Sequence, residues 1–118
     1  MVTETRTRQI EPDITVVEIS GRLSLGNSLL SVENSIRRLV DGGARKLIID
    51  LSGLNAIDSS GIGMLVSTSG YIEQAGGRMR LAGAHGSIAK AFQMVHIERI
   101  ATIEPDLDSA CRSLKAGA

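Results

Sequence analysis

The densest group of polar, potentially reactive side chains is the stretch I-D-S-S-G-I-G, residues 57–63. It places one carboxylate, Asp58, beside two hydroxyls, Ser59 and Ser60, ahead of two glycines. A serine in such a setting can act as a nucleophile or can accept a phosphoryl group from another enzyme. A structural role also exists, because Asp and Ser are preferred N-caps that accept hydrogen bonds from the first turn of a helix. Capping accounts for one of these side chains, and the others need a further explanation.

Nucleophilic catalysis would combine Ser59 or Ser60 with Asp58 and a histidine, either His85 or His96. The local pattern is not that of a nucleophile elbow, which requires G-x-S-x-G. One histidine lies in A-G-A-H-G-S, and the other closes a predicted helix, where a cation near the last carbonyls is favourable. Structural roles are therefore favoured for both histidines. A small hydrolase using Ser59 stays open as an alternative from another functional class.

Cofactor and metal sites have little support in the sequence. Gly61-Ile62-Gly63 begins like G-x-G-x-x-G, but Val66 stands where the third glycine belongs, and no G-x-x-x-x-G-K-[ST] occurs. The two histidines and the single cysteine are spread over separate predicted elements. Asp50 and Asp58 alone are weak evidence for a cation site, and Cys111 fits a small buried hydrophobic side chain. We expect no cofactor and no metal.

Composition excludes further classes of function. Lys and Arg together number 13, as do Asp and Glu, so the formal net charge is zero and nothing favours binding to DNA or to an anionic membrane. One Tyr, one Phe and no Trp offer no stacking platform for nucleic acid. No apolar run approaches the roughly 18 residues of a membrane span. The start of the chain lacks an apolar signal region. We expect one cytoplasmic domain spanning residues 1–118.

Hydrophobic periodicity predicts the elements that must position these residues. Alternation and short apolar runs predict strands over residues 5–10, 14–20, 46–51, 78–84 and 98–103. Apolar stripes at three- and four-residue spacing predict helices over residues 27–40, 60–75, 87–95 and 105–114. The segments 21–26 and 52–59 are interpreted as loops. The order β-β-α-β-α-β-α-β-α predicts an α/β fold with a mixed, mostly parallel sheet and helices packed mainly on one face.

In this arrangement the serines stand at the start of the second helix. A phosphate there would lie near the positive end of the helix dipole, so the fold would tolerate it. It would also add about −1.5 to −2 charges beside Asp58. A partner docked on that surface would be repelled while the fold survives, which is how a binding switch works.

The stretch L-I-I-D-L-S-G-L-N-A-I-D-S-S-G-I-G, residues 47–63, resembles the STAS domain, and most of all the free-standing anti-sigma factor antagonists of bacteria. A-G-G-R-M-R-L-A-G at 75–83 and I-A-K-A-F-Q-M-V-H-I at 88–97 support the resemblance, which covers nearly the whole chain. It implies a STAS-like fold and a regulatory protein without catalysis of its own. A STAS scaffold subunit of a lipid-transport or stress-sensing complex, never phosphorylated, is the alternative within the fold.

The resemblance also implies partners. The unphosphorylated protein would bind a cognate anti-sigma factor that is also a serine kinase, and so free the sigma factor to join RNA polymerase. The kinase would phosphorylate Ser59, the serine directly after the aspartate, and a serine phosphatase would reverse the mark. No nucleic acid and no membrane insertion are expected, and the protein would be a monomer or a weak dimer.

The resemblance assigns the remaining site residues by position. Asp58, Ser60, Gly61 and Ile62 would flank the phosphoacceptor and meet the kinase. G-R-L-S at 21–24 matches the loop after the second strand, which lies beside the phosphorylation site in that fold. The family often has an acid where this chain has Ser24.

Overall fold

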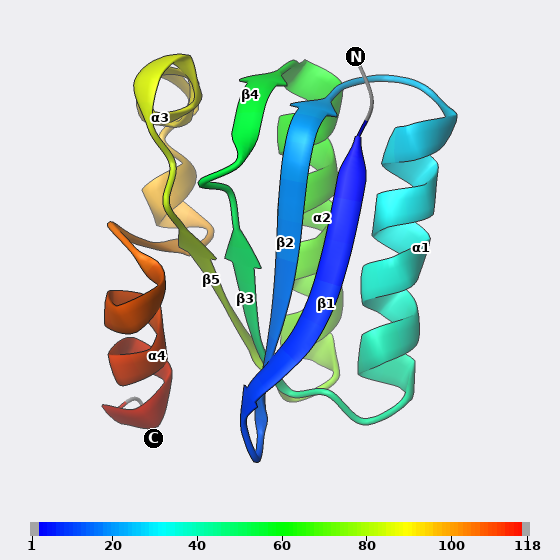
Figure 1. The fold of residues 1–118 in the computed structure, drawn as a ribbon, viewed down its shortest axis with the longest axis vertical. Helices are drawn as coiled ribbons and strands as arrows, with labels where there is room; N and C mark the ends of the chain where they lie inside the picture. The colour runs from blue at the N-terminus through cyan, green and yellow to red at the C-terminus, as the bar shows by residue number, and fades with distance from the viewer. Residues whose placement is uncertain (1–2, 117–118) are drawn as a thin grey trace.

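The computed structural model describes residues 3–116 and shows a six-stranded sheet flanked by helices (Figure 1). The strands are β1 (Glu4–Glu11), β2 (Ile14–Leu23), β3 (Lys46–Asp50), β4 (Leu54–Ile57), β5 (Arg78–Ala82) and β6 (Thr102–Glu104). The helices are α1 (Asn27–Asp41), α2 (Ser59–Gln74), α3 (Gly86–Val95), the 3-10 turn η1 (Ile97–Arg99) and α4 (Leu107–Ala116).

The sheet is mixed and mostly parallel, as the alternation of strands and helices predicts. Its order is β1-β2-β3-β5-β6, with β4 paired to β2 outside this path. Only the β1–β2 hairpin is antiparallel among these pairs, whereas β2–β3, β2–β4, β3–β5 and β5–β6 are parallel. Helical crossovers therefore bring the carboxyl ends of the parallel strands to one end of the molecule.

Two apolar cores lie on the two faces of the sheet. Because successive strand residues point to opposite faces, Leu47 and Ile49 enter the larger core while Ile48 enters the smaller one. The larger core joins the sheet to α1, α2 and α3, and the smaller core joins it to α4 through Ala110 and Leu114. Figure 1 shows α1 and α4 on opposite sides of the sheet. Helices thus pack mainly on one face, which confirms the prediction.

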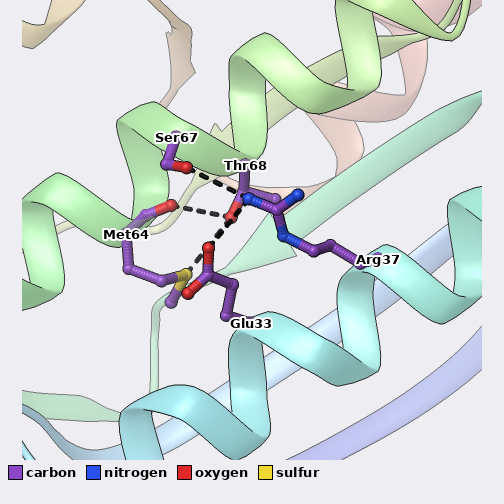
Figure 2. Close-up of polar contacts among 5 residues, drawn as sticks. All are labelled: Glu33, Arg37, Met64, Ser67 and Thr68. Carbon is purple, nitrogen blue, oxygen red and sulfur yellow. Dashed lines mark hydrogen bonds and ion pairs between the residues drawn. The ribbon is translucent and has the colours of Figure 1, made fainter.

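A polar contact group fixes α1 against α2 (Figure 2). The guanidinium of Arg37 donates to Glu33 Oε2 at 3.0 Å and to Ser67 Oγ at 3.3 Å. The same group lies 4.4 Å from the centre of the Tyr71 ring, a cation–π distance. Thr68, fully buried, donates its hydroxyl to a carbonyl one turn back in α2 at 2.7 Å. The two helices are therefore held by polar contacts as well as by apolar packing.

The interpretation of segments 21–26 and 52–59 as loops is partly wrong. β2 continues to Leu23, and the strand β4 occupies Leu54–Ile57. One long strand thus pairs first with β3 and then, beyond Gly21, with β4. A hydrogen bond from Gly21 N to Gly53 O, 3.1 Å, bridges the change of partner. Four residues carry too little periodicity to reveal such a strand, since its pairing depends on a distant segment.

Several boundaries also differ from the predicted ranges, and three of the differences have a clear structural description. α2 begins at Ser59 rather than residue 60, because Asp58 is its N-cap. α4 begins at Leu107 rather than Pro105, and Asp106 Oδ1 accepts from Ser109 N at 2.8 Å as a capping residue does. The strand predicted over 98–103 is the turn η1 followed by the short β6. Among residues 3–116, no helix is long and apolar enough to span a membrane.

Candidate functional site

Two loops meet where β2 and β4 end. The strands are parallel, and Leu23 pairs with Ile57 in their ladder. The residues that follow, 24–26 before α1 and Asp58 before α2, therefore leave the sheet side by side at the end of the molecule drawn uppermost in Figure 1. All the site residues predicted from the sequence lie in these two segments or in the first turn of α2.

The carboxylate of Asp58 joins the two segments. Its Oδ1 accepts from Gly61 N at 2.9 Å, which caps α2. Its Oδ2 accepts from Leu25 N, in the other loop, at 3.1 Å. The backbone N–H of Asp58 donates in turn to Leu23 O at 3.2 Å. One aspartate thus serves as helix cap and as a link across 33 residues of sequence.

These hydrogen bonds also set the charge of the site. The backbone N–H of Gly61, and then that of Leu25, lower the pKa of Asp58 because both stabilise its ionised form. The group is therefore an anion at neutral pH. Within residues 3–116, the hydrogen-bond partners of this carboxylate are backbone amides, and neither histidine is among them. The site therefore lacks the aspartate-to-histidine hydrogen bond of a Ser-His-Asp triad.

Ser59 is the first residue of α2 and is exposed, while Ser60 is half-buried. Because Asp58 provides the cap, the fold does not require the hydroxyl of Ser59 for that purpose. A side chain at the first helical position also lies near the positive end of the helix dipole. Ser59 therefore combines access from solvent with a setting that tolerates added negative charge.

Gly61 and Ile62 face inward. A Cβ at Gly61 would overlap the carbonyl oxygen of Leu23 and lie 2.8 Å from Cγ1 of Ile57, so the start of α2 can approach the sheet this closely only with glycine. Ile62 is half-buried and packs against the larger core. These contacts give both residues structural roles, and a contact of either with a partner stays a prediction.

The opposite loop contributes Ser24 and Leu25. Ser24 is half-buried, and the side chain of Leu25 is 80% exposed directly beside it. Sequence reasoning missed Leu25. The available signal was an apolar residue that belongs to no strand or helix stripe, followed by Gly26. A large apolar side chain held open to water, in a loop bonded to Asp58, is a candidate contact for a partner protein.

The other side chains considered for catalysis or metal binding lie outside these two segments and have other contacts. Asp50 Oδ1 accepts from the backbone and hydroxyl of Ser52, at 3.1 and 2.6 Å. His96 ends α3 in the left-handed conformation and faces Glu98 at 3.5 Å. Burial raises the pKa of the Cys111 thiol, which disfavours the reactive thiolate. Within residues 3–116, no group of three or more His, Cys, Asp and Glu side chains is arranged to hold a metal ion.

Comparison with known proteins places this geometry in context. A family model of the STAS domain matches residues 5–110. An anti-sigma factor antagonist from Mycobacterium paratuberculosis superposes with a TM-score of 0.83 at 19% identity, covering 97% of this chain and 95% of the other. The anti-sigma factor antagonist SpoIIAA in its unphosphorylated form superposes with a TM-score of 0.74 at 18% sequence identity. The match covers 98% of this chain and 100% of the other. The Bacillus cell fate determinant SpoIIAA in its phosphorylated form superposes with a TM-score of 0.72 at 19% sequence identity. The match covers 92% of this chain and 98% of the other.

Proposed function

Because this chain belongs to the STAS domain family, we propose that it is an anti-sigma factor antagonist whose binding is switched by phosphorylation of Ser59. Unphosphorylated, it binds a cognate anti-sigma factor that is also a serine kinase, and the sigma factor is released. Phosphorylated, it dissociates, and a serine phosphatase resets it. The observation that supports this proposal most directly is at the start of α2, where Asp58 caps the helix and the side chain of Ser59 stays exposed.

The chemistry belongs to the partner enzymes. Ser59 Oγ attacks the γ-phosphorus of ATP, the bond from that phosphorus to the bridging oxygen breaks, and ADP leaves. The hydroxyl proton passes to a base on the kinase. The phosphatase transfers the phosphoryl group to water and restores the hydroxyl. This chain supplies only an accessible acceptor, and it is a substrate and a binding partner rather than an enzyme.

Electrostatics explain why a phosphate on Ser59 changes the affinity for the partner more than the stability of the fold. The amides at the start of α2 favour an anion, so the helix accepts the phosphate. At a docked interface, however, the phosphate brings about two negative charges next to the ionised Asp58, and like charges brought together there cost several kcal/mol. The phosphorylated form of SpoIIAA is a precedent for this modification within the fold.

Phosphorylation mapping tests the proposal. The protein is incubated with ATP and the serine kinase that co-purifies with it from the native cell, and the modified peptide is sequenced. We expect phosphate on Ser59, none in Ser59→Ala, and phosphate still on Ser59 in Ser60→Ala. Phosphate on another residue, or none from a kinase proven to bind, would refute the assignment.

A charge substitution tests the switch without a kinase. Ser59→Asp should weaken binding to the same anti-sigma factor by about tenfold or more, since it introduces like charge at the interface. Its thermal unfolding should match that of Ser59→Ala, because the capping carboxylate is untouched. Loss of folding in the aspartate variant alone would show that the serine has a structural duty that the proposal denies.

A further inference from the structure

The loop that carries Leu25 is fixed at both ends and weakly held between them. Leu23, at the end of β2, is fully buried. On the other side, α1 is tied to α2 by the contact of Arg37 with Ser67 (Figure 2) and by the cation–π contact of Arg37 with Tyr71. Between these anchors Gly26 has φ +148°, open space around it, and no side chain to cap α1. The hydrogen bond from Leu25 N to Asp58 is what ties the middle of this loop to the phosphorylation site.

We propose that Asp58 is a positioning residue that couples Ser59 to the 24–26 loop, so that a phosphate on Ser59 releases the backbone amide of Leu25 from the Asp58 carboxylate. This inference rests on the proposed modification of Ser59 and deepens it. The switch then has two parts: charge added at the serine, and displacement of the exposed apolar side chain beside it. Repulsion alone would leave the loop in place.

The two hydrogen bonds of Asp58 differ in how easily they break. The bond to Gly61, 2.9 Å, is local, because it spans three residues at a helix start that close packing against Leu23 fixes in place. The bond to Leu25, 3.1 Å, is exposed and joins segments 33 residues apart. A weak restraint on a loop costs less to break than a local cap on a packed helix.

A phosphate on the adjacent residue acts on this weaker bond in two ways. Its negative charge repels the Asp58 carboxylate, which the structure holds ionised. Its oxygens are also rival acceptors for the free amides at the start of α2. The carboxylate therefore shifts, and the N–H of Leu25 exchanges its acceptor for water. The pairing of Leu23 with Ile57 lies inside the sheet and stays intact.

Amide exchange with water measures this coupling directly. The full chain is made with phosphoserine inserted at position 59 during translation, so that no kinase is needed. Exchange of the Leu25 amide is then measured by NMR magnetisation transfer from water. We expect exchange at least about tenfold faster than in the unmodified protein, since a hydrogen bond to a charged acceptor is lost. Phosphoserine at position 87, exposed near the start of α3, is the matched control and should leave Leu25 unchanged.

Asp58→Asn isolates the positioning role. Asparagine caps a helix through its one carbonyl oxygen but offers an NH2 group where the second carboxylate oxygen stood. We expect α2 to be retained and the Leu25 amide to exchange as fast as in the protein phosphorylated at position 59. Phosphoserine at position 59 should then add no further acceleration in this variant, a non-additivity that a purely structural aspartate would not produce.

The coupling is refuted if phosphoserine at position 59 leaves Leu25 exchange within about twofold of the unmodified value, or if phosphoserine at position 87 accelerates it equally. Failure of the proposed function looks different. Loop release in the translated phosphoprotein, with no kinase able to modify Ser59, would support the coupling and refute the switch. Partner release by phosphate with an unchanged Leu25 amide would support the switch and refute the coupling.

Discussion

At the level of single residues, Asp58 accepts one hydrogen bond from the helix that it caps and another from a loop distant in sequence. Its neighbour Ser59 is thereby free of any capping duty. In the proposed switch, Asp58 therefore has the structural role and Ser59 the regulatory one. The same geometry argues against the hydrolase alternative, because within residues 3–116 no histidine bonds Asp58 to form the relay that would activate Ser59.

The lowered pKa of Asp58 predicts a pH-dependent contribution to stability. A carboxyl group whose pKa is lowered in the folded state stabilises the protein above its unfolded pKa, and this contribution disappears as the pH falls through the folded pKa. Wild type and Asp58→Asn should therefore differ most in free energy of unfolding near neutral pH and converge below about pH 4. Urea unfolding between pH 3 and 7 measures the difference. A difference independent of pH would mean that the charge of Asp58 does not stabilise the fold.

At the level of elements, α2 carries two glycines in its first turns with opposite surroundings. Gly61 lies against Leu23 and Ile57, whereas a Cβ at Gly63 would meet nothing within 4 Å. The first glycine allows the helix to start close to the strand ends, which places Ser59 at the edge of the site. At Gly63, no close contact within residues 3–116 requires a glycine.

This contrast gives a matched pair of variants. Gly63→Ala should stabilise the protein by about 0.5–1 kcal/mol, because alanine is the better helix former and the space is open. Gly61→Ala should destabilise it by about 1–3 kcal/mol, because the added methyl overlaps backbone. Chemical denaturation gives both values. Equal effects of the two substitutions would contradict the close approach of α2 to β2.

At the level of the whole molecule, the sheet leaves β1 at its edge, and six of its eight residues are exposed. Arg6, Arg8 and Glu4 alternate along it, and Arg8 pairs with Glu18 of β2 at 2.8 Å. Charged side chains on an edge strand disfavour pairing with a second copy.

Measurements of self-association test whether the charged side chains of β1 prevent pairing with a second copy. We expect wild type to sediment as a monomer or weak dimer, and the double variant Arg6→Val, Arg8→Val to associate at lower concentration, because valine favours strands and removes the repulsion. The variant Arg112→Val, on an exposed position of α4, is the control and should behave as wild type. Equal association of all three proteins would show that charge on β1 does not limit pairing.

Sequence alone determined the elements with clear local periodicity. The alternation in 14–20, the apolar run 46–51 and the stripes of 27–40 and 60–75 predict their own secondary structure, because side-chain direction repeats locally along strands and helices. The cluster Asp58-Ser59-Ser60 was likewise visible, since capping and phosphoacceptor residues are local patterns. The family followed from the same residues.

Only the tertiary structure decided which residues meet. β4 exists because four residues pair with the far end of β2, and no local pattern encodes a pairing across more than 30 positions. Leu25 belongs to the site because parallel strands end side by side and bring its amide to Asp58. The sequence indicated that capping accounts for one of these side chains, and the structure shows that the capping residue is Asp58. Both side-chain types can cap, and only the folded backbone shows which one accepts the hydrogen bond.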